Sequence, residues 1–317
     1  MDYICNYFMI TGKVIQSTGS GYIVKTESEE LSCSIRGKLR LKGYRSTNPV
    51  AVGDNVKIEI LDENTGVITK ILPRKNCIIR RSTNLSKLSH VLASNIDQTV
   101  FVFTLRNPVT TTTFLDRFLV SAEAYSIPTI IVFNKADIYS EDEYPEIAEL
   151  MATYNEIGYQ VIATSIINKL GIEELRTALK DKTSLIAGHS GVGKTALINT
   201  VSPGMNLKIG DISEAHSTGK HTTTYARMHY LPFNAWIIDS PGIKAYGIIE
   251  LKNEEIYHYF PEIFRISKNC KYYNCNHVNE PQCAVKKAVE DGEIAWWRYK
   301  SYLNIVLDEN DKHRPNI

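Results

Sequence analysis

One segment of the chain has the residue types and spacing of a loop that binds phosphates. It consists of Gly188, His189, Ser190, Gly191, Val192, Gly193, Lys194 and Thr195, which fits G-x-x-x-x-G-K-[ST]. Glycines let such a loop wrap around phosphates with its N–H groups pointing inward; the lysine then reaches the β- and γ-phosphates, and the threonine hydroxyl binds Mg²⁺. A helix expected over residues 195–201, which includes Ala196, directs its positive end at the phosphates. A chance match in a turn is the alternative, but a strand before the segment and a helix after it favour a phosphate loop.

A second segment has the residue types that distinguish guanine from adenine. Asn134, Lys135, Ala136 and Asp137 form N-K-x-D directly after a strand expected over residues 129–133. Asp137 can accept hydrogen bonds from guanine N1–H and the exocyclic amino group, whereas adenine would leave its carboxylate unpaired. Asn134 can contact the other polar edge of the base, and the Lys135 stem can pack over the ring. Alone, N-K-x-D is also compatible with a polar turn; beside a phosphate loop it predicts a guanine site.

The next expected strand ends in Ala163, Thr164 and Ser165, which could offer a backbone N–H to guanine, although an ordinary strand end with turn residues is an equal alternative. Asp239 begins a D-x-P-G segment, in which its carboxylate would lie near the metal and the Gly242 N–H could meet the γ-phosphate. Thr223 lies in a polar run of threonines before the strand expected at residues 225–231. We expect it to complete the Mg²⁺ shell together with Thr195. A polar loop leading into a strand is the alternative for this run.

Hydrolysis needs a group that orients the attacking water. The residue after Gly242 is Ile243, which has no hydrogen-bonding group. We therefore expect the group to come from elsewhere, and His221 is the candidate because it lies in the threonine-rich stretch and can exchange a proton near neutral pH. Lys194 is the second expected catalytic residue. A merely exposed His221 is the alternative, and without help such a site should turn over slowly.

Four soft or borderline metal ligands lie close together near the carboxyl terminus: Cys270, Cys275, His277 and Cys283. Three cysteines and one histidine are a known set for a closed tetrahedral Zn²⁺ site, in which no position is left for water. The spacing differs from paired C-x₂-C knuckles, so unconnected thiols remain an alternative. The other cysteines, Cys5, Cys33 and Cys77, are scattered along the chain.

The elements that must position these residues divide the chain into three parts. Five short β-rich runs between residues 10 and 71 predict a small barrel, plausibly an OB-fold. From residue 94, strand-like runs at 99–105, 129–133, 160–164 and 184–187 alternate with helical runs at 114–125, 146–156 and 172–179, which predicts a parallel sheet with helices on both faces. Strands at 225–231 and 235–239 follow, and then a helical segment with one final helix around residues 284–307. The expected domains are residues 1–73, 74–248 and 249–317.

Composition excludes several classes of protein. A chain of 317 residues with 43% hydrophobic and 22% charged residues can form two or three globular domains. The net charge of +1 gives no overall signal for a polyanionic partner. Apolar runs are too short to cross a membrane, and the amino terminus lacks the basic stretch of a signal peptide. We therefore expect a cytoplasmic protein with reduced cysteines and no membrane partner, and nothing demands more than a monomer.

Local basic clusters are the candidates for contact with RNA. Arg36, Lys38, Arg40 and Lys42 alternate along a run without acidic residues, and Arg80 and Arg81 belong to a second cluster after the barrel. OB-folds bind nucleic acids through a strand face and the adjoining loops. The generic alternative is a solvated surface.

The order of the motifs is the most specific feature. N-K-x-D precedes the phosphate loop, whereas ordinary small GTPases place it after the other motifs. The chain resembles the circularly permuted GTPases, specifically the RsgA (YjeQ) family of small-subunit-dependent ribosomal GTPases, through these motifs, residues 94–98, residues 221–224, and Phe260, Pro261 and Glu262 before the Cys/His cluster. The resemblance covers nearly the whole chain. It implies GTP hydrolysis with Mg²⁺, a structural zinc ion, a catalytic role for His221, and the small (30S) ribosomal subunit with its rRNA as partner in late maturation.

Two other functions are compatible with parts of the pattern. One is a P-loop kinase or ATPase with a zinc-stapled lid. The N-K-x-D motif argues against it, and a comparison of GDP binding with ADP binding distinguishes it from a GTPase. A non-enzymatic RNA-binding module that holds GTP as a structural ligand is compatible with Ile243, and measurable turnover would exclude it.

Overall fold

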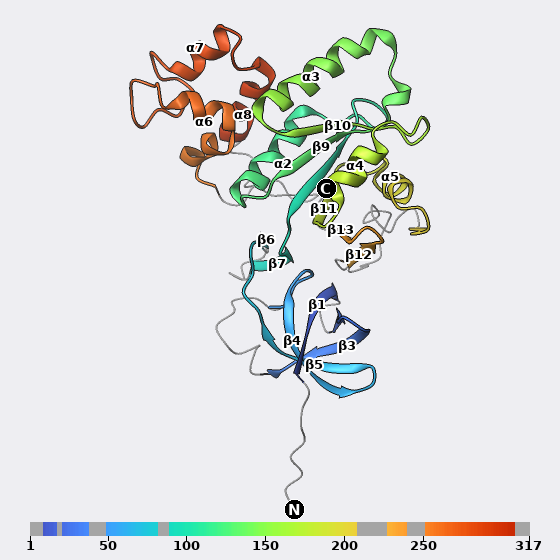
Figure 1. Cartoon of the computed structure of the whole chain (residues 1–317). Coiled ribbons are helices and arrows are strands. Elements are labelled where there is room, and N and C mark those ends of the chain that lie inside the picture. The colour runs from blue at the N-terminus through green and yellow to red at the C-terminus, as the bar shows by residue number, and fades with distance from the viewer. Residues whose placement is uncertain are drawn as a thin grey trace, which may run out of the picture.

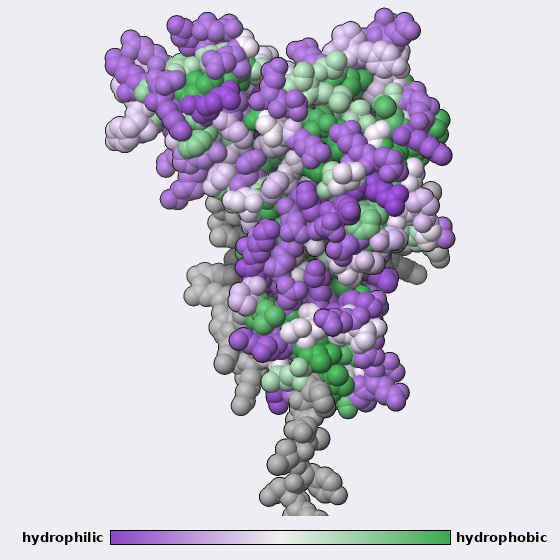
Figure 2. Space-filling view, in the orientation of Figure 1, coloured by the Kyte–Doolittle hydropathy of each residue, from purple (hydrophilic) through white to green (hydrophobic). Residues whose placement is uncertain are grey.

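The computed structural model describes residues 9–17, 21–37, 49–81, 89–207, 227–239 and 251–307, with the backbone alone at positions 80, 81, 89, 90 and 239. Along the chain, Figure 1 shows a β-barrel, then an α/β sheet, then a small helical unit beside that sheet. On the face shown in Figure 2, hydrophilic residues gather where the barrel and the sheet meet. No helix among the described residues is long and apolar enough to cross a membrane.

Five strands form the barrel: β1 (Met9–Ser17), β2 (Tyr22–Lys25), β3 (Glu30–Ile35), β4 (Asn55–Asp62) and β5 (Thr65–Ile71). Their order is β1-β2-β3-β5-β4, and an additional β1–β4 pairing closes the ring. Successive side chains of a strand point to opposite faces, so every second residue enters the barrel. Val14, Val24, Ile58 and Ile68 are fully buried there. The barrel predicted from five short strands is confirmed.

A hairpin that the sequence analysis missed connects the barrel to the sheet. It consists of β6 (Cys77–Arg81) and β7 (Ser89–Ser94). The Asp54 carboxylate, directly before β4, accepts hydrogen bonds from the Arg74 guanidinium (2.7 Å) and from the Ser94 hydroxyl (2.6 Å). Gly53 has φ +91°, and a Cβ there would lie 2.1 Å from the Ser94 carbonyl oxygen. These contacts fix the connection against the barrel.

The central sheet contains β8 (Gln98–Phe103), β9 (Thr129–Phe133), β10 (Gln160–Ala163), β11 (Thr183–Ala187), β12 (Arg227–Leu231) and β13 (Ala235–Asp239). The order is β10-β9-β8-β11-β13-β12, with β12 antiparallel to β13 and the other neighbours parallel. One bridge, between Gln16 of β1 and Arg227 of β12, joins the sheet to the barrel. The parallel sheet was predicted, and its strands differ from the predicted ranges only at their ends.

Helices cover both faces of the sheet, as predicted. Phe101, Phe103 and Ile131 pack against α2 (Thr112–Ala124) and α3 (Tyr144–Ile157). The alternate residues Val100 and Val102 pack with α4 (Ile172–Leu179) and α5 (Lys194–Val201) on the other face. Short 3-10 turns at η1 (Ala136–Ile138) and η2 (Glu141–Glu143) precede α3. The inner strands β8, β9 and β11 are thus buried on both faces, which explains their continuous apolar runs in the sequence.

The carboxyl-terminal unit contains η4 (Asn253–Tyr259), α6 (Pro261–Ser267), α7 (Ala284–Glu290) and α8 (Trp296–Leu307). The prediction of one helix around residues 284–307 is wrong, because two helices occupy this range. The helical conformation is interrupted between them at Gly292, whose φ of +78° lies in the left-handed region in which helices commonly end. The unit packs on α2 through an apolar cluster that includes Val120, Phe260 and Tyr302.

A buried ion cluster joins this unit to the sheet. The Arg298 guanidinium, 1% exposed, donates to both Glu262 oxygens at 2.8 and 3.1 Å and to Asp116 Oδ1 at 2.5 Å. The Tyr154 hydroxyl donates to the same Asp116 oxygen at 2.8 Å. Burial raises the pKa of Asp116, and the Arg298 charge partly opposes that rise. Two carboxylates from two units of the fold therefore depend on one buried cation.

Replacing that cation should destabilise the protein. We expect Arg298→Met to lower the free energy of unfolding by about 3 to 5 kcal/mol, because two buried carboxylates lose their partner. Burial already raises the pKa of Asp116 and removal of the cation would raise it further, so the loss of stability should be smaller at pH 5 than at pH 8. Urea unfolding at both pH values measures this, with Arg265→Met at an exposed position of α6 as control. A loss equal to that of the control would contradict the role of the cluster.

Candidate nucleotide and metal sites

The sequence motifs meet at one edge of the sheet. Asn134 follows β9, Ser165 lies just beyond β10, Gly188 follows β11, and Asp239 ends β13. These strands are parallel, so their carboxyl ends share an edge, and ligands of such sheets bind outside that edge (Figure 1).

Two glycines of the phosphate loop are required by close approaches. Gly188 has φ +133°, and a Cβ there would lie 2.3 Å from the Val102 carbonyl oxygen. Gly193 has φ +97°, and its Cβ would lie 2.6 Å from Asn134 Nδ2. Any other residue at either position would be strained and would push the loop away from the neighbouring strand ends. The loop therefore lies directly against β8 and the N-K-x-D segment.

Lys194 and Thr195 begin α5, and both are buried. Lys194 Nζ donates to the carbonyl oxygens of Gly188 at 3.0 Å and His189 at 2.6 Å, which holds the ammonium inside the curve of the loop. Thr195 Oγ1 is buried without a hydrogen-bond partner in the described part of the chain. A buried hydroxyl normally has a partner, so this oxygen fits a ligand position for a hard cation such as Mg²⁺. Ala196 lies in the first turn of the same helix.

Asn134 connects the two motifs through its side chain. Its Nδ2 donates to the Val192 carbonyl oxygen at 2.8 Å, and its Oδ1 accepts from the Thr164 hydroxyl at 2.9 Å. Asn134 is 2% exposed and Thr164 is fully buried. Because an amide group has two N–H donors, one remains for another acceptor. This role of the Thr164 hydroxyl was not anticipated, since a threonine at a strand end has no distinctive sequence signal.

Asp137 and Lys135 lie at the open side of the same edge. Asp137 is exposed, and its Oδ1 accepts a hydrogen bond from the Ser165 hydroxyl at 2.5 Å. Lys135 Nζ donates to the carbonyl oxygens of Asn107 and Gly191. The Ser165 N–H donates to Leu170, so it is not free for a base in this conformation. Ser165 instead orients the Asp137 carboxylate.

Several expected site residues cannot be placed. His221, Thr223 and Gly242 lie outside the described residues, and Asp239 is described only through its backbone in β13. Ser190 and Gly191 are exposed at the tip of the phosphate loop. The structure thus describes the phosphate loop, the N-K-x-D segment and the strand that leads to D-x-P-G. The threonine run lies outside the described residues.

The phosphate loop also contacts α2. The rings of His189 and Phe114 stack with centroids 4.0 Å apart and an angle of 19° between their planes. Phe114 lies in the first turn of α2, the helix that carries Asp116 of the buried ion cluster. The sequence pattern did not indicate this pairing, since His189 occupies a variable position of the motif.

The four candidate metal ligands converge in the carboxyl-terminal unit. Ligand atoms of Cys270, Cys275, His277 and Cys283 all lie within 4.8 Å of one another. His277 Nδ1 is 3.5 Å from Sγ of Cys270 and of Cys283, and these two sulfurs are 3.9 Å apart. The Tyr299 hydroxyl donates to the His277 carbonyl oxygen at 2.6 Å and so supports the loop. These residues could hold a metal ion.

Burial disfavours the charged forms of these ligands. It raises the pKa of the Cys275 thiol to about 12 and raises that of Cys283, whereas it lowers the pKa of His277. Three neutral thiols and a neutral imidazole attract one another only weakly, so these groups alone do not explain why they cluster. A bound cation would favour thiolates and a neutral imidazole, which is the form in which these groups act as ligands.

The expected basic residues are only partly described. Arg36 is exposed at the end of β3, where its Nη1 donates to Glu59 at 3.1 Å. Lys38, Arg40 and Lys42 lie outside the described residues, and Arg80 and Arg81 are described only by the backbone of β6.

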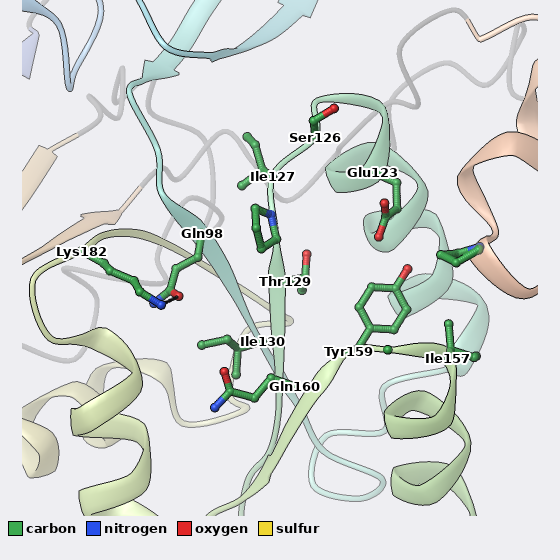
Figure 3. A pocket seen from close by; sticks show the side chains of 13 residues that line it. Gln98, Glu123, Ser126, Ile127, Thr129, Ile130, Ile157, Tyr159, Gln160 and Lys182 are labelled. Carbon is green, nitrogen blue, oxygen red and sulfur yellow. Dashed lines mark hydrogen bonds between the residues drawn. The ribbon is translucent and has the colours of Figure 1, made fainter.

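A cavity of about 520 Å³ lies at the opposite, amino-terminal edge of the sheet. Figure 3 shows Gln98 and Lys182 on one side of it and Glu123 and Tyr159 on the other. None of the residues expected to bind the nucleotide or the metal lines this cavity.

Comparison with known proteins agrees with this arrangement. The model of the family described as RsgA GTPase matches residues 71–249, and that of the RsgA N-terminal domain matches residues 11–68. The chain is 52% identical over 305 residues to the small ribosomal subunit biogenesis GTPase RsgA of Bacteroides fragilis, covering 96% of this chain and 98% of that protein. It is 50% identical over 307 residues to the protein of the same name from Christiangramia forsetii, with the same two shares.

Two solved structures share the whole fold. The crystal structure of YjeQ from Thermotoga maritima has a TM-score of 0.78 and 35% identity, over 95% of this chain and 98% of that one. YloQ, described as a circularly permuted GTPase, has a TM-score of 0.74 and 30% identity over 100% of both chains. The predicted fold of barrel, permuted P-loop domain and carboxyl-terminal helical unit is therefore confirmed. Motif, fold and likeness over nearly the whole length lead to one conclusion: the chain belongs to the RsgA GTPase family.

Proposed function

We propose that this GTPase binds the small ribosomal subunit, acts in its late maturation, and hydrolyses GTP to GDP and phosphate faster when the subunit is bound. The relatives that are half identical to the chain over nearly its full length are named small ribosomal subunit biogenesis GTPases. The observation that best supports the guanine-nucleotide part is the Asn134 side chain, which ties N-K-x-D to the phosphate loop at 2.8 Å. One ligand can then contact both motifs.

Guanine is recognised by Asp137 in this proposal. Its carboxylate, held by Ser165, accepts from N1–H and the exocyclic amino group of the base. The second N–H of Asn134 Nδ2 donates to the other edge of the ring, and the stem of Lys135, fixed at its end by Gly191, packs over it. Ala136 contributes through its backbone, and adenine would leave the Asp137 carboxylate without its donors.

The phosphates lie in the loop formed by Gly188, His189, Ser190, Gly191, Val192 and Gly193. Lys194 leaves its carbonyl partners for the β- and γ-phosphates, where its charge stabilises the transition state. The buried Thr195 hydroxyl and Thr223 bind Mg²⁺, which neutralises charge on the phosphates when bound. Ala196 adds the first turn of α5, Asp239 lies near the metal, and Gly242 meets the γ-phosphate.

His221 orients the attacking water in this proposal. The motivation is chemical: position 243 is isoleucine, so the usual place for a water-positioning glutamine has no polar group. An imidazole near neutral pH can accept or donate the required hydrogen bond.

We further propose that Cys270, Cys275, His277 and Cys283 hold one structural Zn²⁺. Tetrahedral zinc with Zn–S bonds of about 2.3 Å and Zn–N bonds of about 2.0 Å separates its ligand atoms by roughly 3.5 to 3.8 Å. The observed separations of 3.5 and 3.9 Å fit that geometry.

The remaining proposals concern partners and organisation. Residues 1–73 form the ribosome-binding barrel, residues 74–248 the permuted GTPase domain and residues 249–317 the zinc-binding domain. The rRNA of the 30S subunit is the nucleic-acid partner, with Arg36, Lys38, Arg40, Lys42, Arg80 and Arg81 as candidate contacts. We propose a cytoplasmic monomer without a membrane partner.

GTP turnover with and without purified small subunits tests the proposed function. We expect stimulation of wild type, its loss in Lys194→Ala, and no change in Lys180→Ala, an exposed lysine after α4. His221→Ala should bind GTP normally and hydrolyse it more slowly, because it positions water and not nucleotide. A wild-type turnover rate that does not change when subunits are added would contradict the ribosomal role. Equal loss of binding and turnover in His221→Ala would contradict the water-positioning role.

Base selectivity tests the role of Asp137. Asp137→Asn should bind GDP at least about 100-fold more weakly, since an amide cannot accept from both guanine donors. Xanthosine diphosphate, which has a carbonyl in place of the amino group, should bind the variant better than wild type. Titration with fluorescent nucleotides measures both affinities, and Asp142→Asn in the neighbouring turn is the control. Unchanged GDP affinity in Asp137→Asn would be inconsistent with this assignment.

Elemental analysis of the purified protein tests the metal proposal. Wild type and Cys77→Ser should each contain about one zinc per chain, whereas Cys275→Ser should contain much less, because a closed site needs all four ligands. Removing zinc should also lower the unfolding temperature, since binding contributes to folding. A stoichiometric zinc content in Cys275→Ser, or none in wild type, would contradict the proposal.

A further inference from the structure

A band of lysines crosses the outer surface of the barrel. Lys25 of β2 lies directly opposite Lys13 of β1, and Lys57 of β4 lies directly opposite Lys70 of β5. In the β1–β4 pairing, Lys13 lies opposite Asn55 and Lys57 opposite Thr11, so Lys13 and Lys57 are diagonal neighbours. The neighbouring Val14, Val24, Val56 and Ile58 are fully buried, so Lys13, Lys25 and Lys57 point away from the barrel core.

Such a band is unfavourable for the barrel alone. Like charges directly opposite each other in a sheet destabilise it. None of the four lysines forms an ion pair with another described residue, since the salt bridges of this part of the chain involve other side chains. Burial lowers the pKa of Lys13, and the nearby Asp97 only partly opposes this. A phosphate group near these ammonium groups would remove the conflict.

An aromatic pair lies at one end of the band. Lys13 Nζ is 5.6 Å from the centre of the Trp236 ring, and the Trp236 and Tyr230 rings are 5.0 Å apart. Tyr230 is 49% exposed. Trp236 lies on β13, which pairs with β12, and β12 in turn meets β1 of the barrel (Figure 1). The contact with Lys13 therefore crosses this joint.

A hollow of about 400 Å³ opens at this joint. Trp236, Lys13 and Lys25 line it, together with polar residues that include Asn55 and one acidic residue, Glu27. Aromatic rings that stack on bases beside lysines that follow the backbone are the means by which proteins bind single-stranded nucleic acids.

We propose that this joint is a binding site for single-stranded RNA, with one base stacked on Trp236 and the adjoining phosphates along Lys25, Lys13, Lys57 and Lys70. The site differs from the basic loop expected around Lys38 and Lys42, because it lies on the strand face and includes a side chain of the central sheet. The inference rests on the proposed ribosomal function only for the source of the RNA. An RNA strand bound here would contact the barrel and the GTPase domain at the same time.

Salt dependence of binding measures how many phosphates are neutralised. The probe is a fluorescein-labelled single-stranded 12-mer RNA, titrated with the full chain and GDP at several KCl concentrations. Each phosphate contact contributes about 0.7 to the slope of log affinity against log salt for a single strand. We expect the combined Lys25→Gln, Lys57→Gln and Lys70→Gln variant to bind at least about tenfold more weakly at low salt, with the slope reduced by about 2.

Matched variants separate the band from total charge and from folding. The control replaces three lysines elsewhere by glutamine, at positions 169, 180 and 300, and should keep wild-type affinity and slope. Trp236→Leu should weaken RNA binding at least about fivefold without changing the slope, whereas Trp236→Phe keeps a stacking ring and should bind nearly as wild type. Unstimulated GTP turnover should be equal in all of them, which also shows that they are folded.

Three results would overturn the proposal: equal effects of the band and control variants, a loss in Trp236→Phe equal to that in Trp236→Leu, or equally tight binding of a poly-glutamate peptide of the same charge. Failure here is distinguishable from failure of the proposed function. If subunits stimulate turnover of wild type and of the band variant equally, the ribosomal role stands and this site does not.

Discussion

The Asn134 amide is the point at which the two ligand-reading segments depend on each other. Its nitrogen holds the phosphate loop at Val192 and its oxygen is held by Thr164 at the end of the next strand. All three groups are buried, so breaking one bond leaves a polar atom without water. The close approach of Gly193 to the same amide leaves no room for a side chain, which explains why the loop requires glycine there. In the proposed site, base and phosphate recognition therefore share one edge of the sheet.

The other parts of the fold are attached to this edge by buried contacts. The Arg298 guanidinium pairs with Glu262 of the carboxyl-terminal unit and Asp116 of α2. Phe114 in the first turn of α2 stacks on His189 of the phosphate loop. On the other side, the apolar residues Ile15, Met228 and Leu185 form one cluster across the joint between barrel and sheet. A change at the phosphate loop thus has short physical routes to both neighbours, and the Cys/His cluster that could hold a metal ion lies in the third unit.

Much of this arrangement could be predicted from the sequence, and the reasons for success and failure are physical. The phosphate loop and N-K-x-D have fixed spacings, so they could be recognised without a structure, whereas the Cys/His cluster was indicated by four possible ligands close together in the sequence. The inner sheet strands β8, β9 and β11 are buried on both faces and form continuous apolar runs. The β6–β7 hairpin was missed because a short polar-flanked strand has a weak pattern, and the break at Gly292 was missed because one glycine is tolerated in many helices.

Contacts between distant residues were beyond the sequence. Arg298 lies in a helix whose pattern gives no sign that its charge is buried with Asp116, 182 positions away. The lysine band depends on strand register, since Lys13, Lys25, Lys57 and Lys70 are separated in the chain and become neighbours only when the barrel closes. The pairing of Thr164 with Asn134 likewise needs the order of β9 and β10 in the sheet.

The most direct measurement is the GDP affinity of Thr164→Val, because Thr164 is fully buried and its hydroxyl donates to Asn134 Oδ1. The change keeps the shape of the side chain, removes the hydroxyl and leaves Asn134 Oδ1 unpaired, a loss of about 1 to 3 kcal/mol. If the Asn134 bridge holds the two motifs in register, the variant should fold as wild type and bind GDP about tenfold more weakly. Wild-type affinity in a folded Thr164→Val protein would contradict the view that this bridge organises the nucleotide site.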